Sequence, residues 1–378
     1  MTDKKIKIKK NKGKQILSFL AYILLGGILG VLLAIFFPDV VLGNIFGNAI
    51  ALVMGVFVGL FLQILIHEAG HLIFGLLTGY SFVSYRVGSV ALIRVQNKFK
   101  IKRFHIPGTA GQCLMNPPDY KEGEIPYFWY NLGGVLINVI ASMMCLIIIA
   151  QSDVSPYIQS LLLGFALVGF ILAITNGIPQ KIEGMPNDGY NIKMIKEDEQ
   201  SKYAFFVQLR VNALLSEGVR LKDLPLEMVH VKDAEDFSNP LKASRGFLEY
   251  YWHLDHLDFE RAGEVLALAT PYLDQMIPLY RNELNGERLF MELIGDADPT
   301  KIDKIYDIDI QTYMSKMNLM PNKKRIFMAY EGIYKKNQEK AKAYYEELKQ
   351  TASKYPLLGE AEMELMLADW LMKKIESL

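Results

Sequence analysis

Five consecutive residues, His67-Glu68-Ala69-Gly70-His71, have the types and spacing of a metal site. On a helix, two histidines four residues apart project from one face, so both rings can reach one Zn²⁺ at ~2.0–2.1 Å. A glutamate beside such a pair is suited to take a proton from the attacking water. A chance H-E-x-x-H in a chain of this composition is expected on the order of once in a hundred sequences. His67 and His71 are therefore candidate metal ligands, and Glu68 is the candidate catalytic base.

The motif lies in an apolar part of the chain. Between Gln15 and Gly79 there is no Lys or Arg, and the only acidic residues are Asp39 and Glu68. An ionisable group inside a membrane is costly, so function is the default hypothesis for Glu68. Small or polar residues also recur every four positions, which favours close packing against a neighbouring helix. These residues are Gly55, Gly59, Gln63, His67 and His71.

A catalytic zinc ion commonly has three protein ligands and an open fourth position, so a third ligand must come from elsewhere. The candidate is Asp188, and Glu183 is its competitor by chemistry alone. Both lie between Asn176 and Gly189, a segment rich in Gly and Pro. Such a backbone departs from a helix, which is tolerated at membrane depth where it is buried or lines a cavity. The remaining histidines lie in a loop or in the polar C-terminal half and are poor candidates: His105, His230, His253 and His256.

With these motifs the chain resembles the site-2 protease family of intramembrane zinc metalloproteases. That family pairs H-E-x-x-H in one span with Asn-x-x-Pro and Asp-Gly two spans later, as at Asn176 to Pro179 and Asp188-Gly189. A Gly-x-x-x-Asn motif lies between them, here Gly134 to Asn138, with Val135 in place of the usual Pro. The resemblance covers about residues 48 to 190. Asn187 stands where the family commonly has Leu, and the Pro179-to-Asp188 spacing is longer than usual.

The resemblance implies a role for each matching residue. His67, His71 and Asp188 would bind the metal, and Glu68 would be the base. The two asparagines, Asn138 and Asn176, would orient the substrate or polarise its carbonyl.

The apolar runs predict four membrane spans, since a helix of ~20 apolar residues can cross a bilayer. They cover about residues 16–37, 48–78, 128–150 and 157–177. The first run is too long for a cleaved signal peptide, so we expect it to be retained after a basic N-terminus of residues 1–15. Residues 16–190 are therefore expected to form an all-α membrane bundle that carries the metal site.

The loop of residues 80–127 alternates apolar and basic side chains, as at Val95, Phe99 and Ile101. This pattern predicts one or two short β-hairpins. The hairpins could lie near anionic lipid headgroups or pair with a substrate.

Residues 191–378 have the composition of a soluble helical domain. Two stretches, 247–264 and 327–344, each predict an aromatic-rich helix, a turn and a second helix. We expect an irregular tetratricopeptide-like solenoid or a bundle.

The positions of the basic residues predict the orientation of the chain. Lysines gather in residues 4–14, seven basic residues lie in the loop 80–127, and the other two connections have none. The N-terminus, this loop and the C-terminal domain should therefore be cytoplasmic in a multi-pass protein, in the cell membrane of a bacterium. Residues 1–190 hold 15 basic and 9 acidic residues, and residues 191–378 hold 26 and 32, so no strongly basic domain indicates a nucleic-acid partner.

The expected function is intramembrane zinc proteolysis of membrane-spanning or membrane-associated substrates. The alternative is a non-proteolytic zinc-binding adaptor that anchors the helical domain and presents it to a protein partner. An ion transporter is disfavoured because the predicted spans hold a single acidic residue and show no inverted repeat.

Overall fold

The computed structural model describes residues 35, 38, 44–96, 98–103, 110–182, 185–232, 235–317 and 319–378. The predicted N-terminus and, but for Ile35, the predicted first span of residues 16–37 lie outside the described residues. So do His105 and Glu183. The described chain divides into two compact units, one of residues 1–62 and 140–170 and one of residues 63–139 and 171–378.

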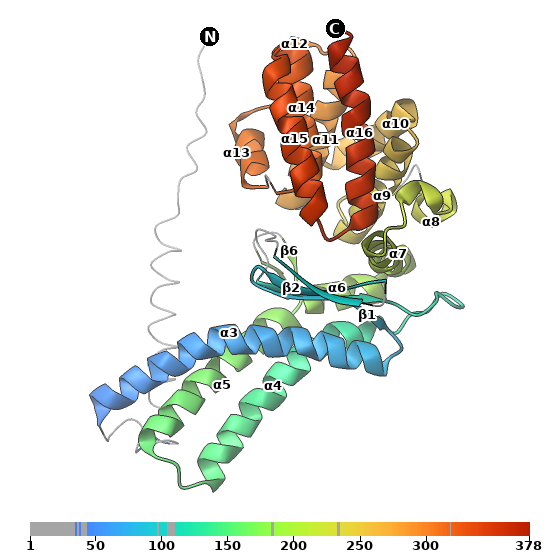
Figure 1. The fold of residues 1–378 in the computed structure, drawn as a ribbon. Coiled ribbons are helices and arrows are strands. Elements are labelled where there is room, and N and C mark those ends of the chain that lie inside the picture. The colour runs from blue at the N-terminus through green and yellow to red at the C-terminus, as the bar shows by residue number, and fades with distance from the viewer. Residues whose placement is uncertain are drawn as a thin grey trace, which may run out of the picture. The chain divides into compact units, whose positions relative to one another are not determined.

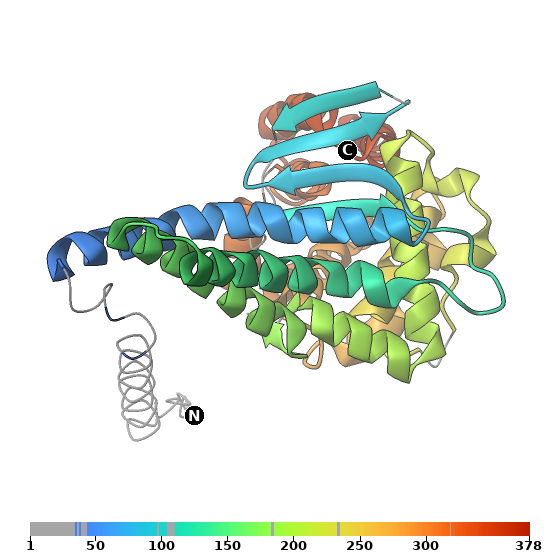
Figure 2. The same ribbon diagram turned by 90° about the horizontal axis from the view of Figure 1, so that it is seen from below.

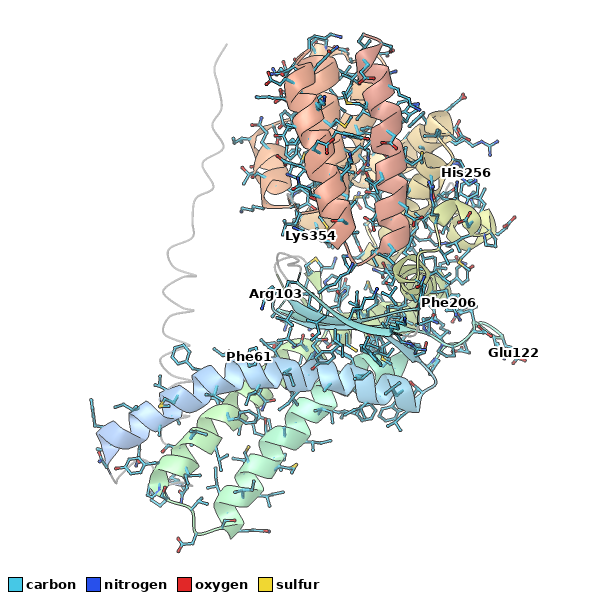
Figure 3. The ribbon with its side chains drawn as sticks, viewed as in Figure 1. Phe61, Arg103, Glu122, Phe206, His256 and Lys354 are labelled. Atoms are coloured by element: carbon cyan, nitrogen blue, oxygen red, sulfur yellow. The ribbon has the colours of Figure 1, made fainter. Side chains whose placement is uncertain are left out.

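Three long apolar helices match three of the predicted spans. They are α3 (Ile45–Leu77), α4 (Tyr127–Gln151) and α5 (Pro156–Gly177). By length and composition each could cross a membrane. Large apolar side chains remain exposed along them, for example Phe61 at 59% (Figure 3). An apolar surface of this kind is typical of a lipid-facing helix. A fourth span is not confirmed, since its residues are not described.

Glycines allow α3 and α5 to approach closely in the first unit. A Cβ atom at Gly55 would lie 2.1 Å from the carbonyl oxygen of Leu161, and one at Gly164 would lie 2.4 Å from that of Leu52. Only residues without side chains permit this backbone contact. The first part of the small-residue stripe thus packs against a neighbouring helix, as the sequence predicted.

A four-stranded antiparallel sheet follows α3 and contains the one or two hairpins expected. Its strands are β1 (Ser81–Val87), β2 (Val90–Val95), β3 (Lys98–Arg103) and β4 (Gly111–Asn116). The spatial order is β3-β2-β1-β4, so β4 returns to pair with β1 and forms an edge (Figure 2).

The two faces of this sheet contact different parts of the second unit. On one face Ala91, Ile93 and Val95 are buried and pack against Leu358 of the helical domain. On the other face the Tyr85 hydroxyl donates a hydrogen bond to the carbonyl oxygen of Leu65 in α3. The sheet therefore lies between the second half of α3 and the C-terminal helices (Figure 1).

The rest of the second unit is helical, apart from a two-stranded ribbon of β5 (Lys181–Ile182) and β6 (Met185–Pro186). The α-helices are α6 (Asp188–Glu197), α7 (Glu199–Ser216), α8 (Leu226–Val229), α9 (Pro240–Asp255), α10 (Phe259–Ala269), α11 (Pro278–Ile294), α12 (Pro299–Ile305), α13 (Ile308–Lys316), α14 (Pro321–Ala329), α15 (Gln338–Lys354) and α16 (Leu358–Glu376). Short helical turns are η1 (Leu221–Asp223), η2 (Thr270–Tyr272) and the π-helical η3 (Tyr330–Tyr334).

The two predicted helix pairs are present as α9 with α10 and α14 with α15, so the all-helical nature of this region is confirmed. Its core also contains a buried ion pair network. Arg325 donates to Glu287 at 2.9 Å and to Glu364 at 2.7 Å, and all three side chains are fully buried. Each charge has an opposite partner, which buried ions require.

Candidate metal centre

Three metal-ligating side chains meet where α3 and α6 approach each other in the second unit. The Nε2 atoms of His67 and His71 lie 3.2 Å apart. The Oδ2 atom of Asp188 lies 3.1 Å from the first and 3.5 Å from the second. All three side chains are at most 18% exposed. The structure thus brings Asp188 to the two histidines, across more than a hundred residues of sequence.

Hydrogen bonds on the far side of each ring fix which nitrogen carries the proton. Nδ1 of His67 lies 2.7 Å from Oδ1 of Asn138, and Nδ1 of His71 lies 2.7 Å from the carbonyl oxygen of Tyr130. Both partners are acceptors, so each Nδ1 is the donor and each neutral ring presents its Nε2 lone pair to Asp188. The amide orientation of Asn138 is set in turn, because its Nδ2 donates to the carbonyl of Gln63 at 2.9 Å.

When both rings are neutral, their two Nε2 lone pairs and the Asp188 carboxylate converge. Within the described residues, Oδ2 of Asp188 is a buried oxygen that accepts no hydrogen bond. A bound cation would satisfy these atoms, as would a proton shared by a ring and the carboxylate. Ligands at ~2.0–2.1 Å in a tetrahedral arrangement lie about 3.3 Å apart, close to the separations seen here. Two imidazoles and a carboxylate suit zinc and other first-row divalent ions. The residues fit a metal ion, and the group of His67, His71 and Asp188 could hold one.

Glycines of α4 make room for the histidines. A Cβ atom at Gly134 would lie 2.6 Å from Cε1 of His67, and one at Gly70 would lie 2.3 Å from the carbonyl oxygen of Gly133. The Gly-x-x-x-Asn motif therefore has a local explanation. Its glycine leaves space for the His67 ring, and its asparagine, Asn138, lies one helical turn later and binds that ring.

Asp188 is held at the first turn of α6 by its two neighbours. Asn187 caps this helix, since its Oδ1 accepts from the N–H of Tyr190 at 2.8 Å. Its Nδ2 donates to the carbonyl of Ile178 at 2.6 Å, which ties the cap to the segment after α5. A Cβ atom at Gly189 would lie 2.2 Å from the carbonyl oxygen of Gly177. The cap and the missing side chain together bring the start of α6 against the end of α5.

Glu68 is buried beside this group, with 8% of its surface exposed. The backbone N–H of Cys113 in β4 donates to its carboxylate. A Cβ atom at Gly111, the first residue of β4, would lie 2.5 Å from its Oε1. The Arg86 guanidinium, which donates to the carbonyl of Gly88 at 2.8 Å, attracts the Glu68 carboxylate across the sheet. The sheet therefore forms one wall around the candidate base.

The two asparagines implied by the family resemblance have different surroundings. The Asn138 amide is used by His67 and Gln63, so in this structure it holds a ligand ring. The Asn176 amide donates to the carbonyl of Leu172 in its own helix at 2.9 Å. The substrate-orienting role of both residues stays a prediction.

Burial changes the ionisation of the groups around the site. It would by itself raise the pKa of Asp188, but the positive charge that His71 and His67 acquire on protonation holds this pKa well below its usual value. Burial, with the nearby Glu68 carboxylate, raises the pKa of the Cys113 thiol above its usual range. Asp188 is therefore ionised and ready to bind a cation, while Cys113 stays a neutral thiol.

Searches of family models, of curated proteins and of solved structures found no match to this chain.

Several residues of the site were not singled out from the sequence. They are Tyr130, Arg86, Gly111, Cys113, Gln63 in its role as a partner of Asn138, and Asn187 in its role as a helix cap. Only Asn187 had a local signal, because Asn before Asp-Gly is a common start of a helix. Tyr130, Cys113 and Gly111 act through backbone atoms or the absence of a side chain, which a motif does not reveal. Gln63 and Arg86 act through side chains that the fold brings close from distant parts of the chain.

Proposed function

We propose that this chain is an intramembrane zinc metalloprotease of the site-2 protease type. The observation that carries the proposal is the convergence of His67, His71 and Asp188, with Glu68 buried next to them in an apolar helix. Two histidines with only a structural role would need neither the Asp188 carboxylate against their Nε2 atoms nor the buried Glu68 carboxylate beside them. A bound zinc ion would polarise the scissile carbonyl and lower the pKa of water.

The residues of the chain supply the remaining steps. Glu68 takes a proton from the attacking water as the new C–O bond forms, and it passes the proton to the leaving amine as the C–N bond breaks. The Cys113 N–H and the space at Gly111 hold its carboxylate in one position. Asn138 keeps the His67 ring turned toward the metal.

The substrate is proposed to be a membrane-spanning or membrane-associated protein with an extended segment at the site. A peptide bond in a helix is shielded by hydrogen bonds, so the segment must unwind before cleavage. Strand β4 is an edge of the sheet and begins beside Glu68. An extended segment added along its beginning would place a peptide bond close to the base.

We also propose that the protein is multi-pass in a bacterial cell membrane, with both termini cytoplasmic. The distribution of lysine and arginine supports this orientation. Glu68 and the metal ligands then lie toward the cytoplasmic side.

The test compares wild-type protein with Glu68→Gln on co-expressed single-span membrane proteins. Loss of the base should slow cleavage at least ~100-fold while the protein keeps its metal. The control is Glu122→Gln, which removes an exposed carboxylate on the loop before α4 (Figure 3) and should leave cleavage unchanged. A membrane proteome that is the same with wild-type and Glu68→Gln protein would instead support the adaptor hypothesis.

A further inference from the structure

The helical domain contains a groove that the proposed protease does not use. It has a volume of about 650 Å³ and is lined by residues of α10, α11, α12 and the turns beside them. Apolar side chains, among them Leu266 and Met291, share the lining with charged ones. Its size is within the range of ligand sites in proteins, ~300–1,000 Å³.

Two of the acidic groups that line this groove are already engaged. Glu292 pairs with Lys301 at 3.5 Å and accepts the backbone N–H of Asp298 at 3.2 Å. Asp307 caps α13, where it accepts the N–H groups of Asp309 and Ile310. These two carboxylates are therefore not free to neutralise other cations in the groove. The third acidic residue of the lining, Asp296, is exposed.

Two cations of the lining, the exposed Lys304 and Arg288 of α11, have no ion pair among the described residues. Arg288 is the less exposed of the two. Its Nη1 donates to Oδ1 of Asn285 at 3.0 Å, and no carboxylate of the described residues lies within ion-pair distance of its guanidinium. In the same domain, the fully buried Arg325 pairs with Glu287, and the fully buried Lys323 pairs with Glu283. Burial alone lowers the pKa of Arg288, with no nearby charge to offset it.

The polar groups around Arg288 are donors. The Oδ1 of Asn285 is occupied by Arg288, which leaves the two N–H bonds of its Nδ2 to donate. Arg288 has further N–H groups in the fork geometry that matches a carboxylate. The exposed Lys304 also lines the groove. A ligand group that binds Arg288 and Asn285 must therefore offer acceptor atoms, and a carboxylate also matches the charge of Arg288.

We propose that this groove binds an acidic segment of a peptide, with a carboxylate on Arg288 and Asn285 and an apolar neighbour on Leu266 and Met291. Three basic and three acidic residues line the groove, which opposes a polyphosphate such as a nucleic acid and suits a ligand with few charges. A peptide with isolated carboxylates among apolar residues fits both the donors and the apolar lining. The proposal does not rest on the proposed proteolysis.

The test is fluorescence anisotropy with the purified full chain in detergent micelles. The probe is a pool of fluorescein-labelled decapeptides randomised over Asp, Glu, Leu, Ala and Ser. A second pool has Asn and Gln in place of the acids. The acidic pool should bind with saturation, and the neutral pool should bind at least tenfold more weakly.

Variants then assign the binding to the groove. Arg288→Gln should weaken binding of the acidic pool at least tenfold, and Arg288→Lys should weaken it less. Arg281→Gln removes an arginine from the same helix, but outside the groove lining, and should leave affinity unchanged. An unchanged thermal unfolding midpoint shows that each variant is folded.

Three outcomes would overturn the proposal. They are no saturable binding of the acidic pool, equal binding of both pools, and equal affinity of wild type and Arg288→Gln. Displacement of the peptides by millimolar inorganic phosphate, with tighter binding of phosphate than of peptide, would also overturn it in favour of a phosphate site.

Discussion

The carboxylate of Glu68 fills the space that a side chain at Gly111 would occupy. A Cβ atom there would meet Oε1, which is the end of a flexible side chain and not a rigid backbone. An added methyl group would therefore displace the Glu68 carboxylate and leave the sheet in place. A shift of about 1 Å in a catalytic group can cost about 100-fold in rate.

Gly111→Ala should therefore reduce proteolysis by roughly 10- to 100-fold, with the metal content and the thermal unfolding midpoint unchanged. The matched control is Gly263→Ala, because a Cβ atom there would lie 3.7 Å from Cε of Met291, an ordinary contact. The measurement is cleavage of a single-span substrate by each purified variant. Full activity of Gly111→Ala would show that the sheet does not position the base.

At the residue scale, the sequence could predict what depends on spacing along one helix. His67, Glu68 and His71 have this property, since the helical period places both rings on one face. The choice between Asp188 and Glu183 could not be made in this way, because both lie in an irregular segment. The structure brings Asp188 to the histidines, and Glu183 lies outside the described residues.

At the scale of elements, the N-terminus of α6 determines where the third ligand lies. Asn187 joins this helix to the end of α5 through bonds to Tyr190, Thr175 and Ile178. An N-cap contributes about 1 kcal/mol to helix stability. Loss of the cap would loosen the first turn, which contains Asp188.

Asn187→Ala should thus weaken zinc affinity about tenfold or more, in the range seen when groups that orient a ligand are removed. Asn187→Ser keeps a capping oxygen and should restore part of this affinity. The control is Asn337→Ala, which removes the equivalent cap of α15, where Asn337 accepts the N–H of Lys340 at 3.0 Å. That variant should lower stability by a similar amount and leave zinc affinity unchanged. Competition with a chelating dye measures the affinity, and equal values for Asn187→Ala and wild type would contradict the account.

A second prediction at this scale concerns Glu360 in α16, the helix whose first residue, Leu358, packs on the sheet. Burial, together with the nearby Glu364 carboxylate, raises the pKa of Glu360 to about 8. In an unfolded chain the pKa of this group would lie near its ordinary value of 4.5. Between these values the folded state holds a proton that the unfolded state has lost, so stability falls as the pH rises from 4.5 to about 8.

Glu360→Gln should remove this loss of folding stability at high pH. Its unfolding midpoint should exceed that of wild type above about pH 8, and the difference should shrink toward zero near pH 5. Differential scanning fluorimetry over this range measures both. An equal difference at every pH would show that the effect is not ionisation of Glu360.

Apolar runs predicted α3, α4 and α5 because membrane-length helices have a strong and local signal. The hairpin pattern predicted β2 and β3, where side chains alternate. It did not predict the pairing of β4 with β1, because the partners are distant in sequence and β4 has little alternation. That pairing places Gly111 and Cys113 beside Glu68.

At the scale of the whole molecule, the candidate site depends on segments far apart in the chain. The candidate ligands come from α3 and α6, the ring of His67 is bound by α4, and the candidate base is held by β4. A metal ion would join these elements, and its binding energy would contribute to their stability. Binding of one ion by three distant residues is therefore the central claim.

The most direct test is the zinc affinity of the purified full chain and of single-ligand variants, measured by elemental analysis at buffered zinc concentrations. Wild type should hold about one zinc ion per chain, as expected for a single three-ligand site. Asp188→Asn and His67→Ala should each lower affinity at least tenfold, and Glu183→Gln should not. Retention of wild-type affinity by Asp188→Asn, or loss of zinc from Glu183→Gln, would contradict the account.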